Sequence, residues 1–355
     1  MAQRSSLIAR TVSTLIILVL ILLAIAVATK LAGSRPFERT VVEMFIRVML
    51  VAGLYIFVGN SGVISFGHMG FMCLGAYAAA WFTIPPVMKQ VTLPGLPAFL
   101  IDAQLPIFVS AALAGLLAAL FALVVGRIMM RLSGIAASIA TFAMLAVINT
   151  VYSNWDSVTG GTGSIVGIPF HTGIWTALGG AIFVVVVAYA YQISRSGLAL
   201  RAGRDEAVAA AASGIDIVRE RLVAFVISAF VIGVAGALYG HFLGVVNPDA
   251  FYLGITFITL SMLVVGGMNS LSGAVLGVIV ISAIIQLLRW LEKGVDLGGT
   301  TLSIPNGLQE IAIGLVMIVI LMFRPSGLTR NRELVWRRPW PGSARPSGEK
   351  IVNVR

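Results

Sequence analysis

Charged residues are scarce in this chain of 355 residues. Asp, Glu, Lys and Arg together make up 11%, against about 25% in an average soluble protein. Hydrophobic residues make up 59%, and the mean hydropathy is +1.00. Apolar runs close to the ~20 residues that cross a ~30 Å hydrocarbon core recur along the chain. The period-two alternation typical of a membrane β-barrel does not stand out. The composition therefore predicts an all-α polytopic membrane protein.

Cysteine and histidine are also scarce in this chain, and a phosphate-binding loop is missing. Cys73 is the only cysteine, which excludes an intramolecular disulfide and favours a small apolar packing role. The histidines, His68, His171 and His241, have no carboxylate or cysteine at ligand spacing, so we expect no metal site. No GxxxxGK(S/T) phosphate loop occurs, and the glycine-rich stretch at residues 160–164 lacks the lysine. We expect no catalytic residues, no cofactor and no ATP hydrolysis by this chain alone.

The apolar runs predict about ten transmembrane helices. They lie at roughly 11–29, 41–58, 66–84, 105–126, 134–152, 174–193, 221–243, 253–268, 271–291 and 304–323. Residues 1–40 should hold a first helix and loop, residues 41–323 the main transmembrane domain, and residues 324–355 a cytoplasmic tail. That tail carries eight Lys or Arg against two Glu, which suits the anionic headgroups of the cytoplasmic leaflet.

Basic residues in the loops predict the orientation of these helices. The loop at 153–173 has no Lys or Arg, so it is expected outside the cell, whereas the loop at 194–220 has four Arg and is expected in the cytoplasm. Ten spans then place both termini in the cytoplasm. The first loop disagrees, because residues 30–39 carry three basic residues against one Glu. If residues 59–66 returned on one side of the membrane, the N-terminus would lie outside.

The N-terminus itself allows two interpretations. Arg4 and Arg10 precede an apolar run, and Ala26-Val27-Ala28 resembles the cleavage site of a signal peptide. The many spans that follow favour a retained first helix.

Two stretches of small and polar residues interrupt the apolar pattern, one in each half of the chain. The first is GNSGVISFGHMGFMCLGAY, residues 59–77, and the second is VVGGMNSLSGAVLG, residues 264–277. A backbone break inside lipid is tolerated only where it is buried in protein or lines a water-filled path. Paired breaks in two related halves, with broken helices, are typical of transporters. Short loops between spans are the alternative, as is a packing role for His68. The candidate path residues are Asn60, Ser61, Ser65, His68, Asn269 and Ser270.

The expected cytoplasmic loop, RAGRDEAVAAAASGIDIVRERL at residues 201–222, predicts a short helix. Its alanine run follows Asp205 and Glu206 and strongly favours helix. Gly214 should end this helix, as a glycine beyond a helix C-terminus commonly does. Asp216 is placed to cap the helix that enters the membrane. A rigid helix between two spans suits docking of a soluble partner, although an ordinary solvated helix would have the same sequence.

Glycines recur every four residues at two places. Gly236, Gly240 and Gly244 lie on one predicted helix, and Gly273 and Gly277 lie on another. This spacing predicts grooves in which helices approach one another closely.

Three stretches resemble a known family. VGNSGVISFGHMGFMCLGAY, TGGTGSIVGIP and GRDEAVAAAASGIDIVRERLVAFVISAFVIGVAGALYG are together similar to the LivM-type permeases of branched-chain amino acid ABC importers. The similarity runs in order from about residue 41 to residue 323. The loop at 201–222 looks like the family's EAA loop, which docks on the ATPase subunit, with the glutamate slightly displaced. By this resemblance Glu206, Ala209, Ala210 and Gly214 fall on the signature positions of the docking loop, and Arg204 and Asp205 of the same loop complete the candidate docking residues.

The resemblance implies a permease subunit in the bacterial inner membrane. The implied partners are a second, LivH-type permease, two cytoplasmic ATPase subunits, a periplasmic substrate-binding protein and an amino acid substrate. No nucleic acid is expected, because most of the positive charge lies in the tail. A zwitterionic aliphatic amino acid needs only a weakly polar, uncharged passage if the binding protein selects it.

Two other transport functions stay open. Permeases for urea or short-chain amides are similar to LivM-type proteins. A self-sufficient secondary transporter would need an ionisable group within the bundle, and the candidates are Glu43, Glu310, His68 and His241. Glu43 is expected to pair with Arg47 four residues on, and Glu310 lies near the start of the last predicted helix, where the helix dipole favours it.

Overall fold

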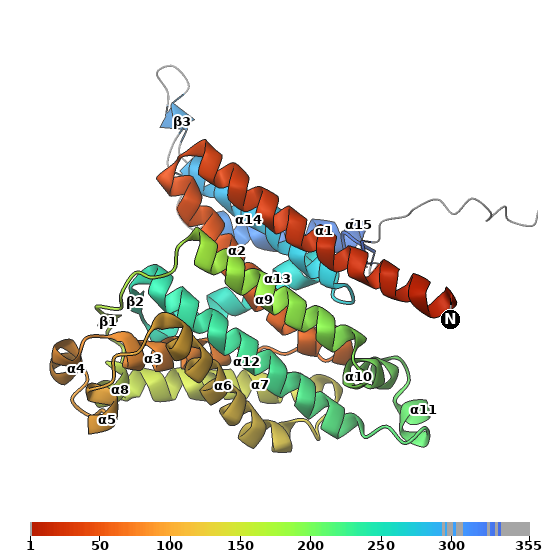
Figure 1. Cartoon of the computed structure of the whole chain (residues 1–355), viewed down its shortest axis with the longest axis horizontal. Helices are drawn as coiled ribbons and strands as arrows, with labels where there is room; N and C mark the ends of the chain where they lie inside the picture. The colour runs from red at the N-terminus through yellow and green to blue at the C-terminus, as the bar shows by residue number, and fades with distance from the viewer. Residues whose placement is uncertain are drawn as a thin grey trace, which may run out of the picture.

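The computed structural model describes residues 2–292, 295–296, 301–302, 308–324, 327–330 and 333–334, and these are mostly helical (Figure 1). The long helices are α1 (Ala2–Ala32), α2 (Arg35–Ser61), α3 (His68–Thr83), α6 (Ile107–Met129), α7 (Gly134–Asn154), α9 (Ile174–Ile193), α12 (Ile217–Leu243), α13 (Leu253–Gly266), α14 (Leu271–Glu292) and α15 (Leu308–Phe323). The short helices are α4 (Pro86–Thr92), α5 (Ala98–Ile101), α8 (Asp156–Thr159), α10 (Arg195–Asp205), α11 (Ala207–Ala212) and the 3-10 helix η1 (Pro248–Phe251). Strand β1 (Ile165–Val166) pairs antiparallel with β2 (Val245–Val246), and β3 (Val295–Asp296) pairs with β4 (Thr301–Leu302).

Each predicted span corresponds to one of the long helices, so the prediction of an all-α polytopic protein is confirmed. Within the described residues, eight helices are long and apolar enough to cross a membrane. One of these eight joins η1 to α13 over Pro248–Gly266, and the helices α3 and α15, with 16 residues each, are not among the eight. The predicted domain boundary at residue 40 falls inside α2, which begins at Arg35. The start of the last predicted span, at 304–307, lies outside the described residues.

The long helices run between two ends of the bundle (Figure 1). One end carries α10, α11 and the first residues of α1, and we call it the α11 end. The other carries α4, α5, α8 and the β1–β2 pair, and we call it the β1 end. The C-terminus of α2 bonds to α10 at the α11 end, and the C-terminal part of α3 bonds to α8 at the β1 end. The helices α2 and α3 are therefore antiparallel, and the residues between them form a turn.

The helices α2 and α12 form the centre of the bundle. Every residue from Val48 to Ser61 of α2 is buried, and α12 packs against α2, α3 and α6. The helices α1, α6 and α7 expose large apolar side chains, such as Leu20, Leu120 and Val147. Exposed apolar faces on long helices are expected where a protein meets lipid.

Glycines let the inner helices approach one another closely, as their spacing predicts. A methyl group on Gly236 of α12 would clash with the carbonyl oxygen of Met72 in α3. A methyl group on Gly277 of α14 would clash with the carbonyl oxygen of Met262 in α13. Gly244 departs from this pattern, since it follows the last residue of α12 with a left-handed φ of +74°. It ends the helix rather than extending the packing groove.

The proline-rich stretch 84–106 contains two short helices, α4 and α5. Lys89 of α4 is fully buried, and its Nζ donates hydrogen bonds to the carbonyl oxygens of Leu100 (2.7 Å) and Ala103. Burial lowers the pKa of this ammonium group, and the nearby Asp102 carboxylate opposes the shift. Prolines lack the backbone donor, so the lysine supplies bonds that tie α4 to the segment around α5.

A few residues of the predicted tail pack on the α11 end. The backbone N–H of Leu328 donates to the Val265 carbonyl oxygen of α13 (2.9 Å). The Glu333 carboxylate accepts from the backbone N–H groups of Leu271 (2.8 Å) and Ser272 (3.0 Å), so it caps the N-terminus of α14. Most of the predicted basic tail, including all residues from 335 onward, lies outside the described residues.

Candidate functional site

The predicted alanine helix is α11, which lies at the α11 end of the bundle (Figure 1). The preceding helix, α10, runs through Asp205 and stops at Glu206, whose extended backbone (φ −153°, ψ 101°) separates the two helices. Asp205 therefore ends α10, whereas the sequence suggested that it begins the alanine helix. Gly214 is left-handed (φ +84°), and the Asp216 carboxylate accepts from the Arg219 N–H (3.1 Å). Both predicted helix-boundary residues are confirmed.

The exposed surface of α11 is apolar. The side chain of Val208 is 77% exposed, and Ala209 and Ala211 are exposed beside it, whereas Ala210 is buried. The helix thus rests on the bundle through Ala210 and presents the other side to the outside. Exposed apolar side chains on a short helix with acidic residues before it suit contact with another protein.

Arg204 of α10 points into the bundle, away from this exposed surface. Its Nη1 donates to the Gly59 carbonyl oxygen (2.7 Å) and to Asn269 Oδ1 (3.1 Å), while Nε and Nη2 donate to Asp205 Oδ1. Gly59 belongs to the last turn of α2, and Asn269 lies in the turn between α13 and α14. One guanidinium group therefore joins α10 to both of the predicted interruptions.

The two interruptions meet at the α11 end. A methyl group on Gly59 would lie 2.7 Å from the carbonyl oxygen of Met268. The helix α2 is ended by Gly62, with a left-handed φ of +72°, and α13 is followed by Gly267 with a φ of +120°. Both interruptions are turns between long helices, which is the alternative that the sequence left open.

Four of the six predicted path residues lie at helix ends or in a turn: Asn60 and Ser61 are the last two residues of α2, and Asn269 and Ser270 lie in the turn between α13 and α14. Asn60 is fully buried, and its Nδ2 donates to the Ile56 carbonyl oxygen (3.0 Å) of its own helix. Ser61 accepts from the Val63 N–H (3.2 Å). Ser270 is fully buried and accepts from the N–H of Gly273 (3.1 Å) at the start of α14. Asn269 is exposed and accepts from Arg204. These hydrogen bonds shape the end of α2 and the turn before α14.

The other two predicted path residues, Ser65 and His68, form a pair of their own. His68 Nδ1 and Ser65 Oγ are 2.7 Å apart, and both residues are buried. The imidazole lies among Phe57, Phe71 and Phe225, with ring centroids 5.4 to 5.7 Å away. This environment agrees with a packing histidine. None of the six predicted residues lines either of the two cavities described below.

The remaining histidines, buried His241 and exposed His171, lie next to each other. His241 Nδ1 lies 2.7 Å from the Ala237 carbonyl oxygen, and Nε2 lies 3.0 Å from Thr83 Oγ1. The His171 ring stacks on His241 at 6.2 Å between centroids, although 70 residues separate the two in the chain. Across the described part of the chain, no three His, Cys, Asp or Glu side chains gather as a metal site.

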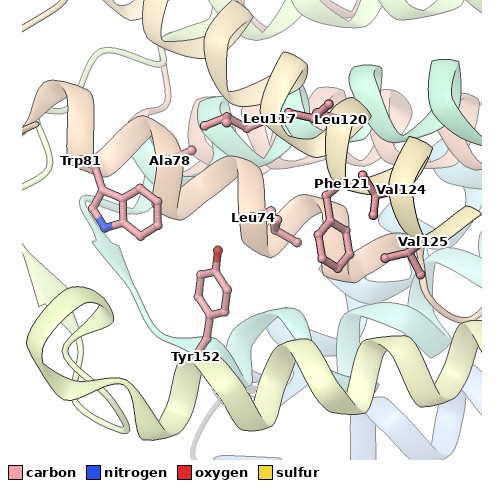
Figure 2. Close-up of a pocket in the computed structure, with 9 residues that line it drawn as sticks. All are labelled: Leu74, Ala78, Trp81, Leu117, Leu120, Phe121, Val124, Val125 and Tyr152. Carbon is pink, nitrogen blue, oxygen red and sulfur yellow. The ribbon is translucent and has the colours of Figure 1, made fainter. Parts of the chain in front are cut away.

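An apolar cavity of about 340 Å³ lies between α3, α6 and α7 (Figure 2). Figure 2 shows Tyr152 pointing from α7 toward α3, with Trp81 at one side, and the Trp81 indole donates to the Val158 carbonyl oxygen (3.0 Å). None of the nine lining residues is charged, so the cavity has no partner for the charges of an amino acid. It suits an apolar group such as a lipid chain. The lining residues are Leu74, Ala78, Trp81, Leu117, Leu120, Phe121, Val124, Val125 and Tyr152.

Comparison with known proteins places these features in a family context. The family model described as "Branched-chain amino acid transport system / permease component" matches residues 37–321. The high-affinity branched-chain amino acid permease protein LivM of Salmonella typhimurium is 26% identical, and that of Escherichia coli is 27% identical. Each of these matches covers 86% of this chain and 73% of the relative. The LivH permease protein of Salmonella typhimurium is 28% identical over 45% of this chain and 47% of its own length. No solved structure gives a significant match.

Proposed function

We propose, since the chain belongs to the family of permease components of branched-chain amino acid transport systems, that it forms part of the path by which these amino acids cross the membrane. The chain is a multi-pass membrane protein and a permease subunit of an ABC importer. The observation that carries the proposal is α11, a short helix with an exposed apolar face at one end of a transmembrane bundle. The sequence has no phosphate loop, so the energy for uptake has to arrive through a partner.

The proposed partners follow from the two ends of the bundle. Two ATPase subunits lie on the cytoplasmic side, and one of them docks at the α11 end, on the loop that contains Asp205, Glu206, Ala209, Ala210 and Gly214. A second, LivH-type permease completes the membrane unit, and the similarity of this chain to both LivM and LivH relatives supports a pair of related subunits. A periplasmic binding protein delivers the amino acid at the β1 end. The inner membrane is the proposed location.

The α11 end is proposed to face the cytoplasm. Arginines are concentrated in the loop at 194–220 at this end, and the loop at 153–173 at the β1 end has no Lys or Arg. The basic first loop is partly neutralised, because Lys30 Nζ lies 2.6 Å from Glu38 Oε1. Its Arg39 lies over the Phe242 ring at 5.8 Å. These contacts support the orientation with both termini in the cytoplasm.

Cysteine labelling tests this orientation. Thr162 in the loop at the β1 end and Ala209 on α11 are both exposed, and the native Cys73 is buried. In a Cys73→Ser background, an impermeant maleimide added to intact cells should label Thr162→Cys and leave Ala209→Cys unlabelled. Both should react after the membrane is permeabilised, which controls for accessibility. Labelling of position 209 alone in intact cells would reverse the proposed orientation.

The six polar residues predicted along the path are proposed to form its inner end. They lie at or near the α11 end, where the turns after α2 and α13 meet and where Arg204 bonds to both turns. Because most of them are buried among helices in this structure, the path is closed here, and substrate passage requires the two turns to separate. Arg204 connects this closure to the docking loop.

Reconstitution tests the proposed function directly. Vesicles that contain this chain, its partner permease and the ATPase subunits should accumulate L-leucine when the binding protein and ATP are both supplied. The same vesicles with a hydrolysis-deficient ATPase subunit serve as the control and should not accumulate it. Accumulation of urea instead of leucine would assign the substrate to the short-chain amides. Leucine accumulation driven by an ion gradient in the absence of ATP would contradict the permease function.

A further inference from the structure

A second cavity, of about 300 Å³, lies toward the β1 end between α2, α12, η1, α13 and α14. Unlike the apolar cavity of Figure 2, it is lined by four charged side chains, Glu43, Arg47, Asp249 and Arg289. Glu43 is in the first third of α2, Arg289 is in the last turn of α14, and Asp249 belongs to η1, which follows β2. The cavity therefore lies toward the end of the bundle at which the proposed function delivers substrate.

One wall of this cavity carries more positive than negative charge. Glu43 pairs with Arg47, as the four-residue spacing predicts, and Arg289 Nη1 also lies 3.0 Å from Glu43 Oε2. The exposed fractions of these side chains are 18% for Glu43, 12% for Arg47 and 37% for Arg289. Two guanidinium groups, with five donors each, thus face one carboxylate, and the Arg47 and Glu43 side chains are largely removed from solvent. Such an excess of positive charge is costly unless an anion joins it.

The balancing negative group is Asp249, which comes from a different element. Its carboxylate accepts a long bond from Asn149 Nδ2 (3.4 Å), and the residue is exposed. The backbone around it is held, because the Asp249 N–H donates to Asn247 Oδ1 (2.9 Å). The Asp249 carboxylate and the two guanidinium groups line the same cavity, which therefore offers both a place for a cation and a place for an anion.

The rest of the lining is largely aliphatic. Ile46 and Leu50 of α2 and Ile255 and Ile258 of α13 line the same cavity. Small-molecule sites are typically ~300–1,000 Å³, mostly apolar, with a few convergent polar groups. The cavity has this combination, at the lower end of the size range, which suits a small solute.

We propose that this cavity is an entry subsite for a zwitterionic amino acid with an aliphatic side chain, an inference that rests on the proposed function. Arg289 and Arg47 receive the α-carboxylate, because a guanidinium binds a carboxylate through two parallel hydrogen bonds. Asp249 receives the α-ammonium group, and the isoleucines and Leu50 contact the side chain. The sequence had favoured an uncharged passage. The structure instead brings together, from three elements, the two signs of charge that a zwitterion carries.

Direct binding to the complete transporter tests this subsite. The complex of both permeases and the ATPase subunits is placed in nanodiscs without binding protein, and equilibrium binding is measured for L-leucine and for 4-methylpentanoate, which lacks the ammonium group. Asp249→Asn should weaken leucine binding about tenfold, as expected for a lost charge-assisted hydrogen bond, and should leave 4-methylpentanoate binding unchanged. Arg289→Gln should weaken both ligands. Arg39→Gln, which makes the same charge change on α2 outside this cavity, is the matched control and should bind both as the wild type does.

Several results would overturn the subsite. The subsite is wrong if the wild-type complex binds no leucine. It is also wrong if the wild type, Asp249→Asn and Arg289→Gln bind leucine equally well. The charged cluster would then only hold the helices together. Asp249→Asn is nearly isosteric and lies on the exposed η1, so it keeps the test informative if Arg289→Gln fails to assemble. Leucine uptake by vesicles with binding protein separates the two proposals. Uptake without binding at this cavity overturns the subsite alone, whereas no uptake by the wild type overturns the proposed substrate.

Discussion

Replacing Val208 by glutamate should strip the ATPase subunits from the assembled transporter and leave the membrane bundle intact. Val208 is 77% exposed on α11, so in the free chain the new carboxylate stays in water. Once an ATPase subunit covers this surface, an unpaired charge is buried, which costs about 2–5 kcal/mol. This corresponds to roughly a 30-fold or greater loss of affinity. Glutamate also favours helix more than valine, so the shape of α11 should be kept.

The measurement is co-purification of the ATPase subunits with the tagged permease, followed by ATPase turnover stimulated by the binding protein. Val208→Gln is the matched control, because it has nearly the same size as the glutamate variant without the charge, and it should retain most of both activities. Wild-type co-purification with Val208→Glu would mean that the ATPase does not cover α11, and this loop would then be only a connector.

The backbone of Gly214 offers an independent approach to the same surface. Its φ of +84° is poorly tolerated by β-branched residues and better by asparagine. Apart from Gly214 itself and its two chain neighbours, no heavy atom lies within 4 Å of where a Cβ would lie at this position. A side chain therefore has room, and only the backbone conformation opposes it. Gly214→Val should therefore misplace α11 and reduce co-purification, and Gly214→Asn should preserve it.

Arg204→Gln should separate ATP hydrolysis from transport. The variant loses the bonds from α10 to the Gly59 carbonyl oxygen and to Asn269, and hydrogen bonds to charged groups contribute about 1.5–3 kcal/mol each. The proposed docking surface on α11 is left unchanged, so the ATPase subunits should still co-purify. The link between the docking loop and the turns after α2 and α13 is broken, and we expect leucine uptake per ATP hydrolysed to fall about tenfold.

A loss of stability alone would lower uptake and hydrolysis together, so the ratio of the two is the decisive readout. Arg219→Gln is the matched control, since Arg219 is exposed at the same end of the bundle and should keep the ratio of the wild type. Arg204→Lys should be intermediate, because an ammonium group lacks the planar fork that reaches several acceptors. An unchanged ratio in Arg204→Gln would exclude this residue as the connection between docking and the path.

The sequence by itself determined the class of the protein, the ten long helices among its described residues and the short helix α11. These features depend on local properties: the length of apolar runs, alanine's helix propensity, and glycine or aspartate at helix ends. Gly214 and Asp216 have the backbone and hydrogen bond that their positions predicted. The four-residue glycine spacing likewise predicted close helix contacts, because that spacing places the glycines on one face of a helix.

Only the tertiary structure decided which polar groups face a cavity and which cap a turn. Asn60, Ser61 and Ser270, which we propose for the path, make hydrogen bonds to backbone groups two to four residues away. Arg204 reaches Gly59, 145 residues earlier, and Arg289 reaches Glu43, 246 residues earlier. A side chain's charge and hydrogen-bonding capacity can be read locally, but its partner depends on which helices pack together. That packing is set by many weak apolar contacts and close glycine approaches summed over the whole bundle, so no single stretch of sequence contains it.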